Sequence, residues 1–254
     1  MGTHLILGPS SAPDIDIIGN RLLAALAAAD FDRLRPYLRR VVLARGQVLF
    51  EPGDDVHTTY FPGRGTMVSL LIATPAGDEV EAATIGREGA VGGIVSAGDK
   101  PAFGRSVVQL AGPALHIETV RLEAAKAESR TLDSLFSRYA DALLAQVMQS
   151  VACNALHSVE ERAARWLLAA HERAGSDAFH LSQQALADML GVQRTTVTTI
   201  CRDLQSRGLI SYRRANLTVE DRRGLEAVAC ECHDAVESHF RMLLPGMAQK
   251  PSGH

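Results

Sequence analysis

The stretch "GVQRTTVTTICRDL", residues 191–204, decides how the second half of this 254-residue chain folds. Its apolar residues recur at helical spacing, but four threonines fill positions between them. β-Branched side chains lose rotamer freedom in a helix, so these threonines lower the local stability of the helix that the pattern predicts. Helix formation therefore does not explain why threonine occupies these positions.

Residues 183–202 predict two short helices that cross tightly. The inward positions are Leu186 and Leu190 in the first helix and Val192, Val197 and Ile200 in the second. Ala187 is small enough for the two backbones to approach, and Gly191 can adopt the positive φ that the turn requires. The spacing indicates a helix-turn-helix, although an ordinary helical hairpin would need the same apolar positions.

The outward face of the second helix separates these two interpretations. It carries no acid, and its residues are Gln193, Arg194, Thr195, Thr196, Thr198, Thr199 and Arg202. A solvated helix face normally mixes Glu and Lys, which form i,i+4 pairs. In a DNA major groove, however, threonine presents a hydroxyl and a methyl group, and arginine binds guanine or phosphate. This face therefore predicts a recognition helix.

Two flanking features extend the predicted DNA contact. Ser182 is placed to cap the first helix, whose free amides would suit a phosphate. The segment "LISYRRANLTVE", residues 209–220, predicts a hairpin with Arg213 and Arg214 near its tip. We interpret this hairpin as a wing against the DNA backbone, with an ordinary solvated turn as the alternative.

The charge of the chain is distributed unevenly. The formal net charge is -3, yet residues 192–214 hold five arginines and one acid, which leaves -7 for the rest of the chain. A local basic region on an acidic molecule fits a protein that binds nucleic acid with one part of its surface. At 46% hydrophobic residues, the chain can also bury a full core.

Cellular location is predicted from what the N-terminus and the cysteines lack. No basic leader precedes an apolar run, and no segment approaches the ~18 to 20 apolar residues that span a bilayer. Four cysteines in a chain of this length do not make a disulfide framework. We expect a cytoplasmic protein that has no membrane partner.

The first half of the chain follows a different pattern. From Val41 to Ile117, short β-branched runs alternate with Gly, Pro and Asp clusters, which predicts a compact antiparallel barrel or roll. A long helical pattern then begins, with an apolar stripe at Leu132, Phe136, Tyr139, Leu143, Val147 and Val151. The stripe is typical of a core helix or of a dimer seam, and we favour the seam.

The β-roll, the long helix and the segment "LSQQALADMLGVQRTTVTTICRDLQSRGLI", residues 181–210, together resemble the Crp/Fnr family of bacterial transcription regulators. The resemblance implies an α+β fold with a jelly-roll-like antiparallel β-roll, a long dimerisation helix and a C-terminal winged helix-turn-helix. It implies a homodimer that places two recognition helices ~34 Å apart on a near-palindromic site. We expect a flexible N-terminus at 1–17, a cyclic-nucleotide-binding-like β-roll at 18–128, the dimerisation helix at 129–158, the DNA-binding domain at 159–235, and a C-terminal helix and tail at 236–254.

The resemblance also exposes departures in the ligand and operator motifs. Cyclic-AMP-responsive members have Glu and Arg where this chain has Thr195 and Thr199, so a different operator is expected. The family's ligand turn, Gly-Glu-x-Gly, corresponds here to "IGREGAVGG", where Arg87 cannot accept a hydrogen bond from a ribose hydroxyl. A shift of one residue would let Glu88 do so.

The candidate ligand residues are Gly86, Arg87, Glu88, Gly89, Arg105 and Ser106. Their chemistry disfavours cyclic AMP and leaves open another anionic or nucleotide ligand, or none. We expect no certain cofactor.

Metal and catalytic sites are not predicted. No cysteine precedes Cys153, which excludes the N-terminal iron-sulfur site of the oxygen-sensing branch, and isolated histidines do not indicate haem. The segment "ACECHDAVESHF" gathers Cys230, Cys232, His233 and His239, whose chemistry is zinc-like but whose spacing matches no zinc finger. We interpret it as a plain C-terminal helix.

We therefore expect a DNA-binding transcription regulator and no enzyme, since the nucleophile, phosphate-loop and zinc-protease motifs are absent. Its expected partners are double-stranded DNA, a second copy of the chain and RNA polymerase. The alternative is a small-molecule or protein-binding sensor module in which the helix-turn-helix serves assembly.

Overall fold

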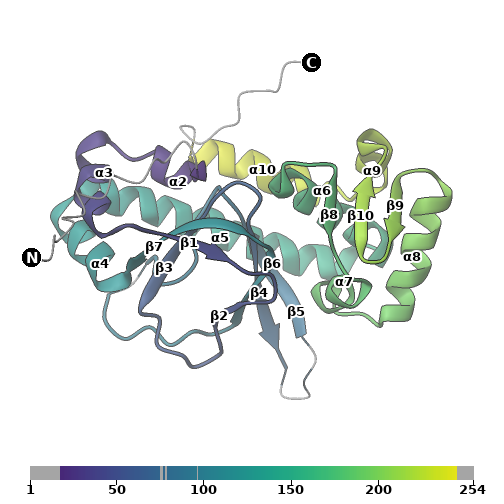
Figure 1. The fold of residues 1–254 in the computed structure, drawn as a ribbon, viewed down its shortest axis with the longest axis horizontal. Helices are drawn as coiled ribbons and strands as arrows, with labels where there is room; N and C mark the ends of the chain where they lie inside the picture. The colour runs from purple at the N-terminus through teal and green to yellow at the C-terminus, as the bar shows by residue number, and fades with distance from the viewer. Residues whose placement is uncertain (1–17, 75–76, 78, 96, 245–254) are drawn as a thin grey trace, which may run out of the picture.

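A computed structural model describes residues 18–74, 77, 79–95 and 97–244 of the chain. Residues 1–17, for which we expected a flexible N-terminus, and residues 245–254 of the expected C-terminal tail lie outside the described residues. The fold is α+β: a strand-rich half and a helix-rich half are connected by one long helix (Figure 1). Among the described residues, no helix combines the length and the apolar character that crossing a bilayer would require.

The strand-rich half is an antiparallel β-roll, as the short β-branched runs predicted. It is preceded by α2 (Arg21–Ala24), α3 (Ala28–Leu34) and a 3-10 turn η1 (Arg35–Tyr37). One sheet has the order β1-β7-β3, formed by β1 (Arg39–Leu43), β7 (Gly112–Glu118) and β3 (Thr58–Pro62). The other has the order β2-β6-β4-β5, formed by β2 (Val48–Phe50), β6 (Arg105–Leu110), β4 (Met67–Ala73) and β5 (Glu79–Ile85). Leu43, Val68 and Val108 are buried together in one core of the roll.

Two helices follow the roll, α4 (Thr119–Glu128) and α5 (Arg130–Leu156). The Ser129 side chain caps α5 by accepting a hydrogen bond from the Leu132 amide. With 27 residues, α5 is about 40 Å long and runs past both halves of the molecule (Figure 1).

The residues of the apolar stripe predicted on this helix differ in how far they are buried. Leu132, Phe136 and Tyr139 are buried in the molecule's own core, because the N-terminal helices and α10 pack against this face. Leu143 and Val147 are half-buried, and of the predicted stripe only Val151 is strongly exposed. The exposed apolar face contains Leu144 and Met148 instead, so the stripe assigned to a dimer seam was mostly a core face.

The helix-rich half begins at Ser158, which forms a capping box with Glu161. Its elements are α6 (Val159–Ala174), β8 (Ala178–His180), α7 (Gln183–Leu190), α8 (Arg194–Ser206), β9 (Ile210–Arg213), β10 (Asn216–Val219), α9 (Arg222–Val228) and α10 (Cys232–Leu243). The three strands form an antiparallel sheet in the order β8-β10-β9. After α9 the chain leaves this domain, and α10 packs back against α5 (Figure 1).

Candidate DNA-binding site

The turn between α7 and α8 has the geometry that its small residues predicted. Gly191 ends α7 at φ +64°, and Ala187 is fully buried where the two helices approach. The Val192 amide donates to the Ala187 carbonyl at 3.1 Å, which closes the turn. Ser182 caps α7, because its Oγ accepts a hydrogen bond from the Ala185 amide at 3.0 Å. The helix-turn-helix expected from the sequence is therefore present.

One inward position of α8 differs from the prediction. Val197, Cys201 and Leu204 are buried, whereas Ile200 is only partly buried. At 100° per residue, Ile200 and Cys201 lie on opposite sides of the line from Val197 to Leu204, so the tilt of α8 decides which of them faces the core. Burial raises the pKa of the Cys201 thiol to about 11, as expected for an inert core residue.

The outward face of α8 is open to solvent and carries no acid from Arg194 to Arg202; the exposed Asp203 follows and pairs with Arg207. The exposed residues of this face are Gln193, Arg194, Thr195, Thr196, Thr199 and Arg202. Thr199 Oγ1 donates to the Thr195 carbonyl at 3.2 Å, so this hydroxyl is satisfied within the helix while the side chain stays exposed. The face can thus remain without protein partners at little cost in unsatisfied hydrogen bonds.

Thr198 has a different place from the other three threonines. It is half-buried, and its Oγ1 donates to Gln183 Oε1 on α7 at 2.8 Å. This bond connects the two helices of the motif, so Thr198 positions α8 rather than extending its open face.

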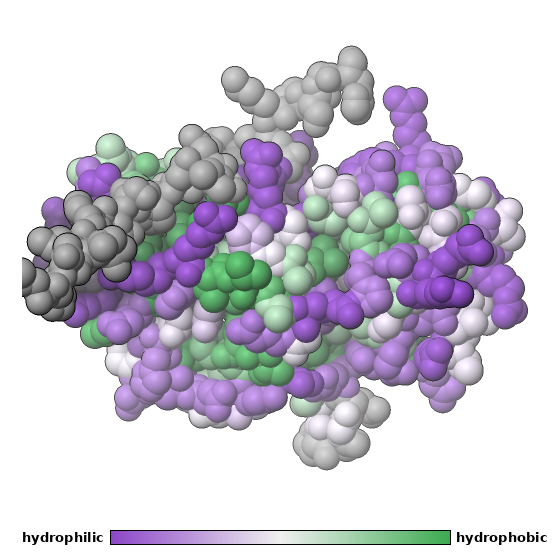
Figure 2. Space-filling model, viewed as in Figure 1, coloured by the Kyte–Doolittle hydropathy of each residue, from purple (hydrophilic) through white to green (hydrophobic). Residues whose placement is uncertain are grey.

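The arginines of this region differ in whether acids neutralise them. Arg207 bonds to Glu160 at 2.7 Å and to Asp203 at 3.1 Å. In the part of the chain that the structure describes, no ion pair involves the other four, Arg194, Arg202, Arg213 and Arg214. These four cations of α8 and the hairpin after it form an electrostatic footprint for an anionic partner. The surface at this end of the molecule is mostly hydrophilic (Figure 2).

The hairpin β9–β10 presents two of these cations at its tip. Arg213 and Arg214 are exposed, and the turn places Arg214 at φ +51° and Ala215 at φ +64°. Two positive φ angles define a tight hairpin turn that normally takes Asn and Gly, so the backbone here is strained. Tyr212 anchors the base of the hairpin by donating its hydroxyl to the Leu181 carbonyl at 3.0 Å. The hairpin has the shape of a wing beside α8 (Figure 1).

The predicted ligand residues do not come together as one site. Arg105 lies at the start of β6, half-exposed, 3.4 Å from Glu51 and 3.5 Å from Glu79. The strand pairing aligns it with Leu71, whereas Ile85 is aligned with Val68. Gly86 to Gly89 follow β5 at its other end, roughly 15 Å away along the strands. Ser106, beside Arg105, is buried at the same remote end.

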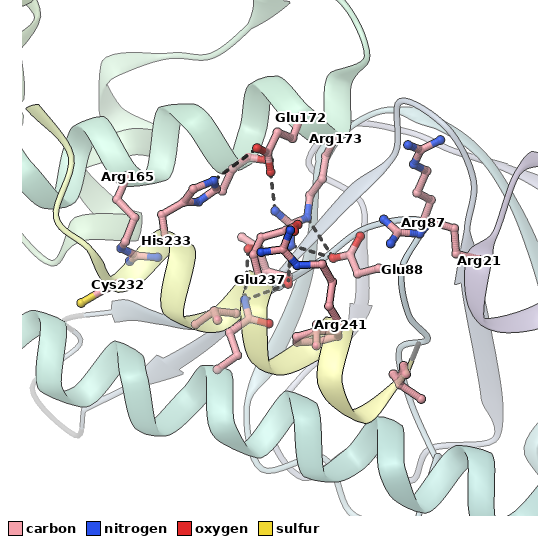
Figure 3. Close-up of a pocket in the computed structure, with 16 residues that line it drawn as sticks. Arg21, Arg87, Glu88, Arg165, Glu172, Arg173, Cys232, His233, Glu237 and Arg241 are labelled. Carbon is pink, nitrogen blue, oxygen red and sulfur yellow. Dashed lines mark hydrogen bonds and ion pairs between the residues drawn. The ribbon is translucent and has the colours of Figure 1, made fainter. Parts of the chain in front are cut away.

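Glu88 binds to the helix-rich half of the molecule. Its Oε1 accepts hydrogen bonds from Arg173 Nε at 3.0 Å, Arg173 Nη2 at 2.6 Å and the Gly86 amide at 2.9 Å (Figure 3). Burial alone would raise the pKa of Glu88, but the Arg173 charge and the backbone amides hold it below its ordinary value. This carboxylate therefore links the β-roll to α6 and is occupied by protein.

A pocket that opens to solvent adjoins this link where β5, α5, α6 and α10 meet (Figure 3). Arg21, Arg87, Arg173 and Arg241 line it together with Glu172. Glu172 pairs with Arg222 at 2.6 Å and with His233 at 3.2 Å. Sequence reasoning included Arg87 in the ligand set but not the other four, because the pocket is built from segments more than 200 residues apart.

Known proteins are similar to this chain in its helix-turn-helix domain and over much of its length. Residues 161–228 match the Crp-like helix-turn-helix domain. The global nitrogen regulator of Nostoc sp. is 28% identical over 185 residues, covering 69% of this chain and 82% of that protein. The corresponding regulator of Synechocystis sp. is also 28% identical, over 76% of this chain and 91% of its own length.

Solved structures show the same fold. FixK2 from Bradyrhizobium japonicum aligns with a TM-score of 0.65 at 15% identity, covering 76% of this chain and 98% of its own. The c-di-GMP-responsive global regulator CLP from Xanthomonas campestris aligns with a TM-score of 0.62 at 18% identity, covering 76% and 99%. With its β-roll, its Crp-like helix-turn-helix domain and these relatives, the chain is a DNA-binding transcription regulator similar to those of the Crp/Fnr family.

Proposed function

We propose that the chain acts as a homodimer that grips near-palindromic double-stranded DNA, with α8 in the major groove and the β9–β10 wing on the backbone. The observation that carries this proposal is the exposed face of α8, which carries no acid from Arg194 to Arg202 and is continued by the wing. Four arginines of this surface have no ion pair among the residues that the structure describes. A helix fits the width of the major groove, and the cations replace counterions released from the phosphates.

Within this interface we distinguish the side chains that would contact DNA bases from those that would contact phosphates. Arg194, Thr195 and Thr199, in the first two turns of α8, would contact base edges, since the N-terminal part of a recognition helix enters the groove. The residues suited to phosphate contact are Ser182, Gln193, Thr196, Arg202, Arg213 and Arg214. Thr198 would act on DNA only indirectly, through its bond to Gln183.

The exposed face of α5 supports the dimer. Leu144, Met148 and Val151 are 56%, 64% and 66% exposed and are spaced by four and three residues. This is the repeat of a two-helix seam, and a second copy of α5 would remove these apolar side chains from water. On this basis we assign dimerisation to residues 129–158. We further propose that residues 18–128 form the β-roll and that residues 159–235 bind DNA. We expect RNA polymerase as a further partner.

The test begins with selection of bound duplexes from a random DNA pool, which supplies the operator. Arg194→Ala should then bind that operator about 5- to 150-fold more weakly, since a good arginine–base contact contributes about 1 to 3 kcal/mol. The dimer mass should remain unchanged, because Arg194 is exposed on α8, a different helix from the seam. Arg35→Ala, which removes a half-exposed arginine beside the β-roll, serves as the control and should bind normally.

An Arg194→Ala variant with unchanged affinity and base preference would refute the recognition-helix assignment. The salt dependence distinguishes the alternative, in which the helix-turn-helix serves only assembly. Counterion release makes DNA affinity fall steeply with salt, whereas apolar assembly responds little.

A further inference from the structure

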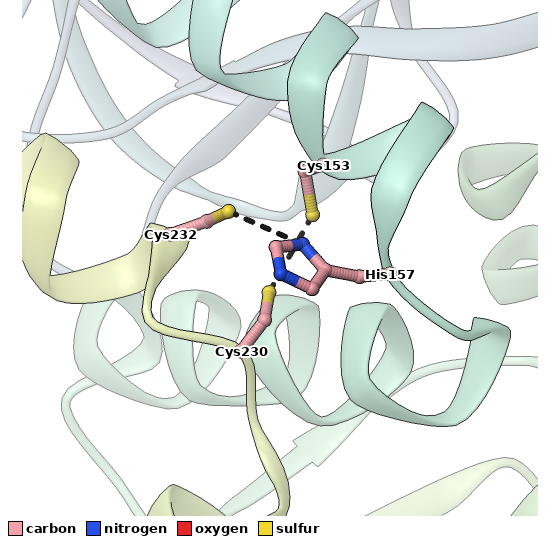
Figure 4. Close-up of side chains that lie close together, drawn as sticks. All are labelled: Cys153, His157, Cys230 and Cys232. Atoms are coloured by element: carbon pink, nitrogen blue, oxygen red, sulfur yellow. Dashed lines mark hydrogen bonds between the residues drawn. The ribbon is translucent and has the colours of Figure 1, made fainter.

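Three cysteines and one histidine meet at the end of α5, outside the DNA-binding face. Cys153 and His157 come from the last turn of α5 and its C-cap, and Cys230 and Cys232 come from the start of α10 and the segment before it (Figure 4). Their four ligand atoms all lie within 4.8 Å of one another. Cys153 Sγ is 3.5 Å from Cys230 Sγ, and Cys232 Sγ is 3.5 Å from His157 Nδ1. The cysteines are buried, with at most 5% of each residue exposed.

The separations of 3.5 Å match those between ligands of a single ion, and the other ligand atoms lie within 4.8 Å. A tetrahedral Zn²⁺ with Zn–S bonds of about 2.3 Å and a Zn–N bond of about 2.0 Å holds its ligand atoms roughly 3.5 to 3.8 Å apart. An iron-sulfur cluster interposes several irons and sulfides between its cysteines, which would then stand farther apart. We propose that Cys153, His157, Cys230 and Cys232 form a Cys₃His site for one tetrahedral divalent cation of the Zn²⁺ type.

The surroundings of the four side chains have the partners that a metal site needs. His157 turns Nδ1 toward Cys232, and its other nitrogen, Nε2, lies 3.3 Å from Glu231 Oε1. A carboxylate on the far side of a ligating imidazole orients the ring and selects its tautomer. Gln149 Nε2 donates to Cys232 Sγ at 3.0 Å, a bond that stabilises a thiolate.

Charge balance points the same way. Three thiolates, a neutral imidazole and Zn²⁺ leave a net charge of about -1 in a buried place, which nearby cations must offset. Arg162 and Arg165 are close enough to Cys153 to act on it electrostatically. The Nε atoms of both arginines are buried. Neither Nε atom has a hydrogen-bond partner among the described residues.

The position of the site gives it a consequence for DNA binding. His157 stands between α5 and α6, where the chain enters the winged domain, and Cys230 and Cys232 stand where it leaves toward α10. One ion would therefore attach the segment that enters the winged domain and the segment that leaves it to the end of α5. It would hold the winged domain in one orientation. This consequence rests on the proposed DNA-binding function, whereas the metal site itself does not.

The first experiment uses the full-length protein purified under reducing conditions. Elemental analysis should find about one zinc per chain, and after zinc removal one equivalent of Co²⁺ should give the intense visible absorption of tetrahedral cobalt with thiolate ligands. Iron with sulfide, or no bound metal together with a Cys153–Cys230 disulfide, would overturn the proposal. The cobalt titration needs no substitution, so a variant that fails to fold cannot obscure the result.

Variants then assign the ligands. Cys153→Ser and Cys232→Ser should each weaken metal affinity strongly, whereas Cys201→Ser, a buried cysteine in the core of α8, should keep one ion per chain. Glu231→Ala should lower the affinity about 10- to 100-fold, the usual effect of losing a carboxylate behind a histidine ligand. Equal metal content in all four variants would place the ion elsewhere.

The coupling to DNA is measured with the selected operator. Removal of the ion by a chelator should lower operator affinity at least about 10-fold, and added Zn²⁺ should restore it. An affinity that does not change on removal refutes the coupling while the metal site stands. A loaded protein that binds no duplex refutes the proposed DNA interface instead, so the two failures are distinguishable.

Discussion

Two regions of this molecule use arginine in opposite ways. On α8 and the wing, Arg194, Arg202, Arg213 and Arg214 are exposed and form no ion pair with any residue that the structure describes. At the junction of the β-roll and α6, Arg173 is held by Glu88 in a pair that is about 15% exposed. Arginine is thus available to bind a separate molecule on α8 and the wing, whereas at the junction it binds an acid of its own chain.

The difference has a physical basis. A buried charge without a partner costs several kcal/mol, so the junction must contain its own acid. An exposed guanidinium is hydrated and needs no partner, and an acid placed beside it would compete with DNA phosphates. Whether an arginine is paired with a buried acid therefore distinguishes residues that stabilise the fold from residues available for binding. Loss of the acid should lower the free energy of unfolding at the junction but not at an exposed arginine.

The largest effect is expected at the junction. Glu88→Gln leaves Arg173 buried and charged without its carboxylate, which should lower the free energy of unfolding by about 3 to 5 kcal/mol. Denaturant unfolding measures this loss. Glu118→Gln is the matched control, because its pair with Arg121 is 3.7 Å long and exposed and should contribute no more than about 1 kcal/mol. Equal losses in the two variants would contradict the comparison.

A second acid of α6, Glu172, has its partners on α9 and α10 and predicts a pH dependence. Burial opposes ionisation of Glu172, but His233 and Arg222 hold its pKa at about 2. A carboxyl whose pKa is lowered by folding stabilises the protein above its unfolded pKa of about 4.5 and loses that contribution as the pH falls toward 2.

The stability gap between the wild type and Glu172→Gln measures this contribution. It should be roughly 3 kcal/mol near pH 6 and should narrow as the pH falls from 5 to 3, since each pKa unit corresponds to about 1.4 kcal/mol. A gap that stays constant over this range would show that the Glu172 charge contributes nothing.

The smallest effect belongs to the strained wing. Ala215→Gly removes the cost of a side chain at φ +64° and should raise the unfolding free energy by about 0.5 to 1 kcal/mol, after allowance for the greater freedom of glycine in the unfolded chain. Gly208→Ala makes the reverse change at φ +72° in open space and should destabilise by about 1 kcal/mol. Thermal unfolding compares them, and shifts of the same sign would exclude backbone strain as the cause.

The helix-turn-helix and the exposed face of α8 were predictable because they are local. Gly191, Ala187 and the apolar positions of residues 183–204 lie within a few helical turns, and their spacing determines which residues face outward. The misassigned positions were borderline ones. Ile200 and Cys201 flank the buried line of α8, and the tilt of the helix, a tertiary property, selected between them.

The long helix shows the same limit on a larger scale. The residues Leu132, Phe136 and Tyr139 were correctly seen to be apolar, but spacing alone does not say whether a stripe meets the same chain or a second copy. The answer came from α10, which packs against α5 and covers one of its faces.

By itself, then, the sequence determined the α+β class, the helix-turn-helix and the residues that its second helix exposes, since periodicity and turn residues act over short distances. Only the tertiary structure decided which side chains from distant segments meet. It separated Arg105 from Glu88, paired Glu88 with Arg173, and brought Cys153 and His157 to Cys230 and Cys232 across more than 70 residues. Such encounters depend on how whole elements pack, and no local pattern encodes them.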